Sequence, residues 1–123
     1  MTILPPSDQD LYSTMRELKW SSTEKAIARR CFDRALQQEL DAAIQSTKQK
    51  AAKIKQASEL WELERHLTHL RKKLDDQYEY KYSTLILLFA DLVREGKLDP
   101  EDLRGLSRDK FRHIRRHAEQ SAA

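Results

Sequence analysis

Proline and glycine are scarce in this sequence of 123 residues, which contains three prolines and two glycines. None of the five lies between Ser7 and Glu95, so no residue in that span opposes a helix on backbone grounds. The breakers that separate the short elements of compact folds are gathered near the two ends instead. The sequence therefore predicts long helices, and such proteins offer surfaces for binding more readily than pockets for catalysis.

Cysteine and long apolar runs are equally scarce. Cys31 is the only cysteine, so no disulfide can form within one chain, and we interpret it as a small core residue. No apolar run of about 18 residues is present that could span a membrane. The first ten residues lack the basic start and apolar stretch of a signal peptide, so we expect a cytoplasmic protein.

Neither sign of charge is in large excess, because 23 basic and 20 acidic residues leave a formal net charge of only +3. This balance favours a solvated helical surface over a general coat for nucleic acid. About half of the residues are Ala, Glu, Lys, Leu or Arg, a share typical of coiled coils and long helices. A single elongated chain would leave its apolar stripe partly in water, so we expect a homodimer.

These patterns predict an all-α fold, in which long antiparallel helices form an elongated stalk that carries a small helical head. We divide the chain into a flexible N-terminal arm (1–20), a helical stalk that dimerises (21–81), a helical head (82–118) and a tail (119–123).

Helix boundaries in the stalk follow from capping signals. Ser21 and Glu24 have the spacing of a capping box, so the first long helix should begin there. Ser58 is the expected N-cap of the second. That helix carries leucines at near-heptad spacing, which is typical of a coiled-coil seam or a bundle layer: Leu60, Leu63, Leu67, Leu70 and Leu74. Whether Asp75 and Asp76 break the helix is left open.

The head should contain three short helices. The apolar segment 84–90 is predicted to be a buried helix that stops at Gly96. Asp99 is the expected cap of the next helix, with Pro100 at its first position, and Ser107 should open the last one.

Side chains for chemistry are weakly represented, and we predict no catalytic residue, metal or cofactor. The sequence has no glycine-rich phosphate loop and no paired metal-binding motif. His113 and His117 are one turn apart, but three arginines crowd them. His66 and His69 lack a second set of ligands, so we interpret both as surface residues.

A basic stretch from Arg104 to His117 is the main alternative clue to function. Its lysine and arginines could bind phosphates, which would make the protein a dimeric coiled-coil nucleic-acid binder. No recognition-helix motif precedes the stretch, and cations also stabilise a helix C-terminus. Nucleic acid is therefore the less favoured partner.

Trp61 is the expected anchor of the dimer. It is the largest side chain in a stalk of leucine and alanine, and aromatic residues concentrate in interface cores. We predict a dimer interface that contains Leu60, Trp61, Leu63 and Leu67.

Several motifs resemble one known family, from about Trp20 to Ala118. They are W-S-x-x-E at 20–24, R-A-L-Q-Q-E-L at 34–40, L-W-x-L at 60–63, Y-x-Y-K-Y-S-x-L-I at 78–86 and F-A-x-L-V-x-E-G at 89–96. Taken together, in this order, they are similar to the fluorescence recovery protein of cyanobacteria.

The resemblance implies a dimeric, all-helical regulator that is not an enzyme. Such a protein binds photoactivated orange carotenoid protein, largely through the C-terminal domain of that partner, and speeds its return to the inactive orange form. Quenching of phycobilisome fluorescence then ends. The same resemblance implies an interface role for Trp61 and partner-binding roles for Arg71, Leu87 and Phe89. It implies a cytoplasmic location, with peripheral attachment to thylakoid membranes left open.

The chain departs from the family pattern at three charged positions. Glu64 and Arg65 replace the usual His-Asp pair after the tryptophan, and Lys73 replaces a glutamate. Because charge reversal on an interface changes which partner it accepts, we count Glu64 and Arg65 among the partner-binding residues. The alternative is a divergent homologue that acts on another carotenoid protein or on none.

Overall fold

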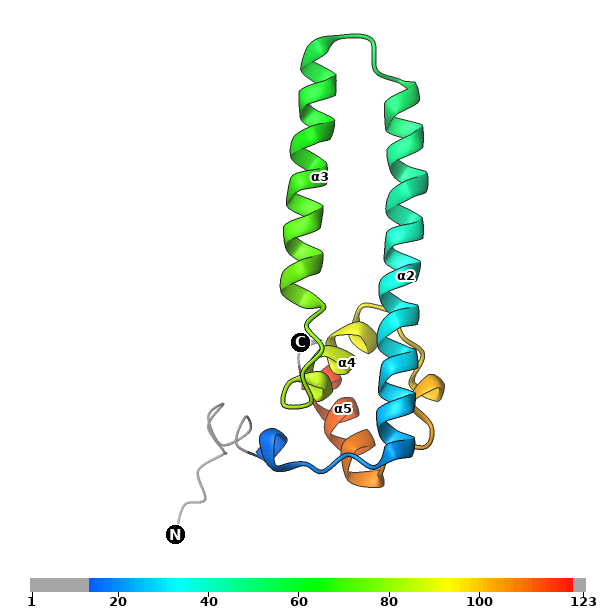
Figure 1. The fold of residues 1–123 in the computed structure, drawn as a ribbon, viewed down its shortest axis with the longest axis vertical. Coiled ribbons are helices and arrows are strands. Elements are labelled where there is room, and N and C mark those ends of the chain that lie inside the picture. The colour runs from blue at the N-terminus through cyan, green and yellow to red at the C-terminus, as the bar shows by residue number, and fades with distance from the viewer. Residues whose placement is uncertain (1–13, 121–123) are drawn as a thin grey trace. The chain divides into compact units, whose positions relative to one another are not determined.

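The computed structural model describes residues 14–120, and no strand occurs among them. A helical turn at residues 14–17 precedes four longer elements and one short one: α2 (Ser22–Ala52), α3 (Ala57–Gln77), α4 (Leu85–Arg94), the 3₁₀ helix η1 (Pro100–Leu103) and α5 (Arg108–Gln120) (Figure 1). The prediction of an all-α fold is confirmed. Residues 1–13 of the predicted arm and 121–123 of the tail lie outside the described residues.

The chain divides into two compact units. The hairpin unit is Phe32–Glu79, in which most of α2 and all of α3 run antiparallel on either side of a short connection (Figure 1). The terminal unit combines residues 14–31 with residues 80–120. Its boundaries place the first turns of α2 with the C-terminal helices, and the predicted limits of stalk and head stay a prediction.

Helix α2 begins where the sequence predicts. The backbone N–H of Glu24 donates to Ser21 Oγ at 3.1 Å, and that of Ser21 donates to Glu24 Oε1 at 3.0 Å. These are the two reciprocal bonds of a capping box.

Helix α3 begins two residues earlier than predicted, because Gln56, not Ser58, occupies the N-cap. Glu59 Oε1 accepts from the backbone N–H of Gln56 at 3.2 Å, which satisfies a donor that the helix itself cannot. At its other end α3 continues through Asp75 and Asp76 to Gln77. The open question is therefore settled, since these exposed acids form a turn of the helix and not a break.

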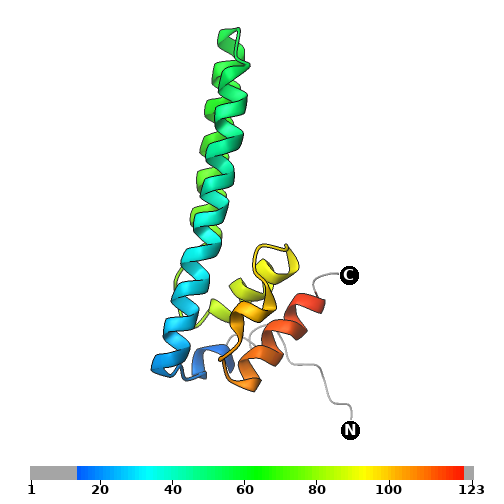
Figure 2. The ribbon, with the colours of Figure 1, turned by 90° about the vertical axis from the view of Figure 1, so that its right-hand side faces the viewer.

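The terminal unit has an apolar core built on α4. Leu85, Ile86, Phe89 and Leu92 are fully buried, and α4 packs against α5 (Figure 2). Helix α4 ends at Arg94, and Gly96 follows the C-cap Glu95 with a φ of 74°, the left-handed conformation that glycine adopts just after helix ends. The predicted stop is confirmed.

The remaining predicted caps are also present. Asp99 accepts from the backbone N–H of Glu101 at 3.0 Å and opens η1, which is a 3₁₀ helix. Ser107 Oγ accepts from the backbone N–H of Lys110 at 3.3 Å and precedes α5. Cys31 is buried, and its Sγ lies 3.2 Å from the carbonyl oxygen of Asp102, which agrees with its interpretation as a core residue.

Candidate interaction surfaces

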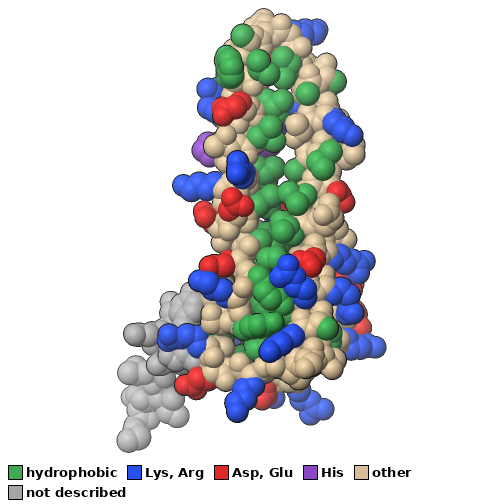
Figure 3. Space-filling model, in the orientation of Figure 1, with side chains coloured by type: hydrophobic (Ala, Val, Ile, Leu, Met, Phe, Trp, Pro, Cys, Tyr) green, Lys and Arg blue, Asp and Glu red, His purple; other side chains and the backbone are tan. Residues whose placement is uncertain are grey.

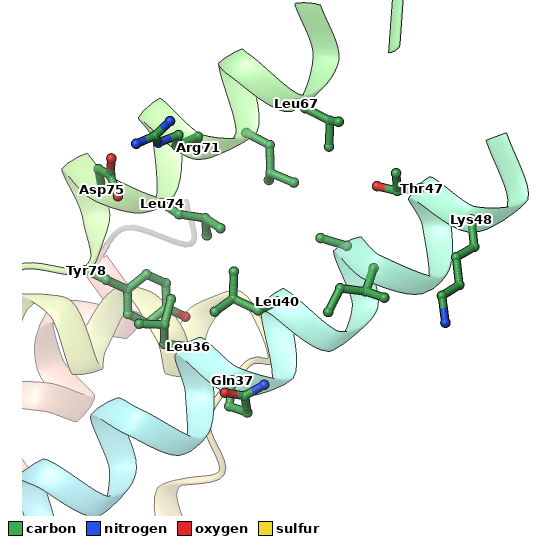
Figure 4. Close-up of a pocket in the computed structure, with 13 residues that line it drawn as sticks. Leu36, Gln37, Leu40, Thr47, Lys48, Leu67, Arg71, Leu74, Asp75 and Tyr78 are labelled. Atoms are coloured by element: carbon green, nitrogen blue, oxygen red, sulfur yellow. The ribbon is translucent and has the colours of Figure 1, made fainter. Parts of the chain in front are cut away.

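An apolar groove of about 690 Å³ lies between α2 and α3 in the hairpin unit. Figure 4 shows Leu36 and Leu40 of α2 on one side, and Leu67 and Leu74 of α3 with Tyr78, the residue that follows α3, on the other. The remaining lining residues are Gln37, Ala43, Ile44, Thr47, Lys48, Leu70, Arg71 and Asp75. Eight of the thirteen lining residues are aliphatic or aromatic, so the groove offers an apolar contact surface to a partner.

Large apolar side chains of the hairpin unit remain in water. Five of them are between 38% and 57% exposed: Leu40, Ile44, Leu60, Trp61 and Leu67. In Figure 3 hydrophobic side chains gather along this hairpin, with charged side chains beside them. Because exposed apolar surface of this extent marks interaction sites, the hairpin unit has a face that a single chain does not cover.

A second groove of about 320 Å³ follows the flank of α3. Its lining residues are Leu60, Leu63, Glu64, Leu67, Thr68 and Arg71. Thr68 Oγ1 donates to the carbonyl oxygen of Glu64 at 3.0 Å and lies 3.2 Å from Glu64 Oε1, so it holds this carboxylate at the groove. The groove thus brings the three predicted dimer leucines together with two predicted partner-binding residues.

Two of the predicted site residues on α3 line neither groove. Trp61 is 57% exposed and lines neither of them. At 3.6 residues per turn it falls about 160° around the helix from Leu63. Arg65, one turn further on, is also exposed. The predicted interface residues therefore occupy two different faces of α3.

The predicted partner-binding residues of α4 differ in burial. Leu87 is half-buried, whereas Phe89 is fully buried in the core of the terminal unit. In this conformation the Phe89 ring has no surface to offer a partner. A partner-binding role for either residue stays a prediction.

A buried ion pair joins the start of α2 to the start of α5. Lys110 Nζ lies 3.1 Å from Glu24 Oε2, and their side chains are 5% and 10% exposed. Glu24 Oε2 also accepts from the backbone N–H of Ser107 at 2.9 Å, and Lys110 Nζ donates to the carbonyl oxygen of Lys19. Each buried charge is thus both paired and hydrogen-bonded, as its removal from water requires.

The pKa of Glu24 reflects this network. Burial acts to raise it, but hydrogen bonds from the backbone N–H groups of Ser21 and Ser107 and the ammonium of Lys110 outweigh burial and lower the pKa to about 2.

Three aromatic rings in the terminal unit form a row that carries cations. The Tyr82 ring lies 5.6 Å from the Trp20 ring and 5.6 Å from the Tyr80 ring, measured between centroids. Lys25 Nζ is 5.5 Å from the Tyr82 centroid, and the Arg29 guanidinium carbon is 4.6 Å from that of Tyr80. These five residues, Trp20, Lys25, Arg29, Tyr80 and Tyr82, are called the aromatic patch below.

Sequence reasoning missed both the ion pair and the aromatic patch as units. The motifs that contain Trp20, Glu24, Tyr80 and Tyr82 were recognised, but only as a cap and as family markers. A signal was present, because W-S-x-x-E and Y-x-Y-K-Y hold aromatic and charged residues together. Their joint position depends on contacts between distant parts of the chain, and one sequence does not show these.

The basic stretch near the C-terminus is less available than its sequence indicates. Lys110 was counted in it but is buried against Glu24. Arg104 pairs with Glu101 at 2.7 Å, and Arg112 pairs with Asp109 at 3.4 Å. Half of the six cations counted there are therefore paired with acids, which weakens the case for phosphate binding.

The described part of the chain holds no cluster of three or more His, Cys, Asp or Glu side chains that could bind a metal ion. None of its helices is long and apolar enough to cross a membrane.

Comparison with known proteins decides the family. Residues 20–118 match the family described as photoprotection regulator fluorescence recovery protein. The chain belongs to this family. The resemblance based on the motifs is thereby confirmed, over the predicted range from Trp20 to Ala118. The members of this family are regulators.

Similar proteins have been described from two cyanobacteria. The chain is 34% identical over 99 residues to the fluorescence recovery protein of Synechocystis sp., covering 80% of this chain and 91% of that protein. The structure of the Fremyella diplosiphon fluorescence recovery protein gives a TM-score of 0.79 at 33% identity, covering 82% of this chain and 99% of the other. The Synechocystis structure gives the same TM-score at 34% identity, with the same coverage.

Proposed function

We propose that this protein binds photoactivated orange carotenoid protein, through the C-terminal domain of that partner, and accelerates its return to the inactive orange form. Recovery of phycobilisome fluorescence would follow. The similarity to the Synechocystis fluorescence recovery protein over most of both chains carries the proposal. The exposed side chains of the hairpin unit support a binding role, because a regulator that prefers the compact form of its partner needs only a docking surface. We place this activity in the cytoplasm.

We further propose that the protein acts as a homodimer whose interface is the uncovered apolar face of the hairpin unit. Complete burial of a fully exposed leucine or isoleucine side chain contributes about 1.5–3 kcal/mol. The leucine and isoleucine side chains of this face are 38–49% exposed, so each would gain about half of that on dimerisation. A second copy presents the same apolar face, as an isologous interface requires. Leu60, Trp61, Leu63 and Leu67 would belong to this interface.

Partner contacts are proposed for Glu64, Arg65 and Arg71 in the hairpin unit and for Leu87 in the terminal unit. A contact through Phe89, the other predicted residue of α4, would require the terminal unit to open, because its ring is fully buried. Arg71 is the sharpest candidate, because this exposed cation lines both grooves.

The proposed activity predicts a faster dark recovery of the carotenoid protein. A several-fold molar excess of this protein should shorten the decay of the red state, followed by visible absorbance, at least several-fold relative to buffer. Arg71→Gln should slow the accelerated recovery, whereas Lys72→Gln, a matched change at the next exposed cation of α3, should leave it unchanged. Recovery no faster than in buffer would contradict the proposed function.

If the protein is a dimer through this face, placing a charge on the face should lower its molar mass in solution. Leu67→Glu and Trp61→Glu should each shift the mass from light scattering toward one subunit, because a buried carboxylate without a partner is costly. His69→Glu adds the same charge at an exposed polar position of α3 and should preserve the dimer. If only Leu67→Glu dissociates it, Trp61 does not belong to the interface, and a monomeric wild type refutes the dimer altogether.

A further inference from the structure

The aromatic patch is not needed to fill the core of the terminal unit. Phe89 is the one aromatic side chain among the buried residues described in that core, where Leu85, Leu92 and Leu103 are also fully buried. Tyr82, in contrast, is 38% exposed, and Trp20 and Tyr80 are half-buried. The rings thus lie at the surface of the unit, where tyrosine and tryptophan are typical of binding hot spots.

The rings are held in place by neighbours from other parts of the chain. Lys25 and Arg29 are one turn apart on α2, so both cations approach the segment that carries Tyr80 and Tyr82. Trp20 contacts Tyr82 on one side, and Lys110 Nζ lies 4.9 Å from the indole centroid. Side chains that are fixed before binding lose less conformational entropy on binding, so the patch is preorganised for contact.

The indole N–H of Trp20 is not satisfied as buried donors normally are. Its Nε1 is buried and has no hydrogen-bond acceptor among the described residues. A buried donor left unpaired costs about 1–3 kcal/mol. In native proteins, unsatisfied buried groups of this kind concentrate at functional sites, where function compensates for the loss of stability.

The charge of the patch specifies its partner. Lys25 and Arg29 add two positive charges beside the rings. Complementary potential requires an acidic surface on the other side. Stacking of nucleic-acid bases is disfavoured, because a cation of the protein itself already lies against each ring: Lys25 on Tyr82, Arg29 on Tyr80 and Lys110 on Trp20.

We infer that the aromatic patch is a docking surface for an acidic region of the protein partner, in addition to the partner contacts proposed in the hairpin unit. This inference rests on the proposed function, because the partner is the photoactivated carotenoid protein. The rings supply the contact area, and Lys25 supplies charge complementarity at the rim.

The test measures binding of red-state orange carotenoid protein to the full-length protein by biolayer interferometry. Tyr82→Ala should weaken binding at least about tenfold, as expected for a hot-spot side chain. Lys25→Glu should weaken it several-fold, mainly by slowing association, and the effect should shrink as salt rises. Circular dichroism and thermal melting check that each variant is folded.

Arg115→Glu is the matched control, since it reverses an exposed positive charge of the same unit outside the patch. If the wild type binds and both patch variants bind as Arg115→Glu does, the docking surface is refuted while the proposed function stands. If the wild type itself does not bind, the proposed function fails and the surface fails with it. Retention of a single-stranded oligonucleotide that Lys25→Glu abolishes would overturn the inference in favour of nucleic acid.

Discussion

Replacing Lys110 with methionine is expected to lower the free energy of unfolding by about 3–5 kcal/mol, the usual cost of breaking a buried ion pair from one side. The Glu24 carboxylate would stay buried without its counter-charge, and the carbonyl oxygen of Lys19 would lose a donor. Such a loss is a large part of the 5–15 kcal/mol that stabilises a typical domain. Denaturant unfolding followed by circular dichroism measures it, at one fixed protein concentration because dimerisation would contribute to stability.

Arg112→Met provides the control on the same helix. Arg112 also pairs with an acid, Asp109, but their side chains are 68% and 75% exposed. Exposed pairs contribute at most about 1 kcal/mol, so this variant should unfold close to the wild type. The double variant Glu24→Gln, Lys110→Met should lose less than the sum of the two single losses, since neither charge is then left alone. A Lys110→Met variant as stable as Arg112→Met would contradict the role given to the pair.

The pH dependence of stability tests the acidic member of the same ion pair, Glu24. The pKa of Glu24 in the folded protein, about 2, is below its usual 4.5. The unfolded state therefore takes up a proton first as the pH falls. The stabilisation from Glu24 is fully present above about pH 4.5 and is lost as the pH falls toward 2, with a total of at most about 3 kcal/mol. In Lys110→Met this acid-dependent loss should be smaller, because one group that lowers the pKa is gone.

Local signals in the sequence were sufficient for most of the helix boundaries. The Ser21 and Glu24 capping box, the Asp99 cap and the Gly96 stop each depend on residues a few positions apart, so the sequence contains the whole interaction. The cap of α3 was predicted wrongly for a related reason. Serine is the more common N-cap, but Glu59 can reach the backbone of Gln56, and this choice between neighbouring caps is decided by geometry.

The candidate sites were harder to predict because they combine distant segments. Lys110 appears in the sequence as one of several cations on a basic helix, and only its position next to Glu24 shows that it is buried. Similarly, periodicity predicted an apolar role for Leu67 but not that it lines both grooves. Trp61 was assigned to the same seam as the leucines because of its size. Its place on the helical wheel, about 160° from Leu63, was available from the sequence and indicates a different face.

Replacing Phe89 with alanine is expected to cost about 3–5 kcal/mol of unfolding free energy, the range for truncation of a buried phenylalanine. Its ring is fully buried beside other fully buried side chains of the terminal unit, so little room exists for collapse around the cavity. Denaturant unfolding again provides the measurement. Phe89→Leu keeps most of the volume and should cost less than about 1.5 kcal/mol. If both variants lose the same free energy of unfolding, the size of the cavity does not determine the loss.

The Phe89→Leu variant also separates packing from partner binding. Because the Phe89 ring is buried, a folded Phe89→Leu variant should accelerate recovery of the carotenoid protein as the wild type does. Leu87→Ala changes a half-buried position and should give a slower recovery than Phe89→Leu. If Phe89→Leu is folded and stable yet inactive in the dark-recovery assay, the ring must become exposed when the partner binds. The terminal unit would then have to open during binding, because no other route brings a fully buried side chain to a partner.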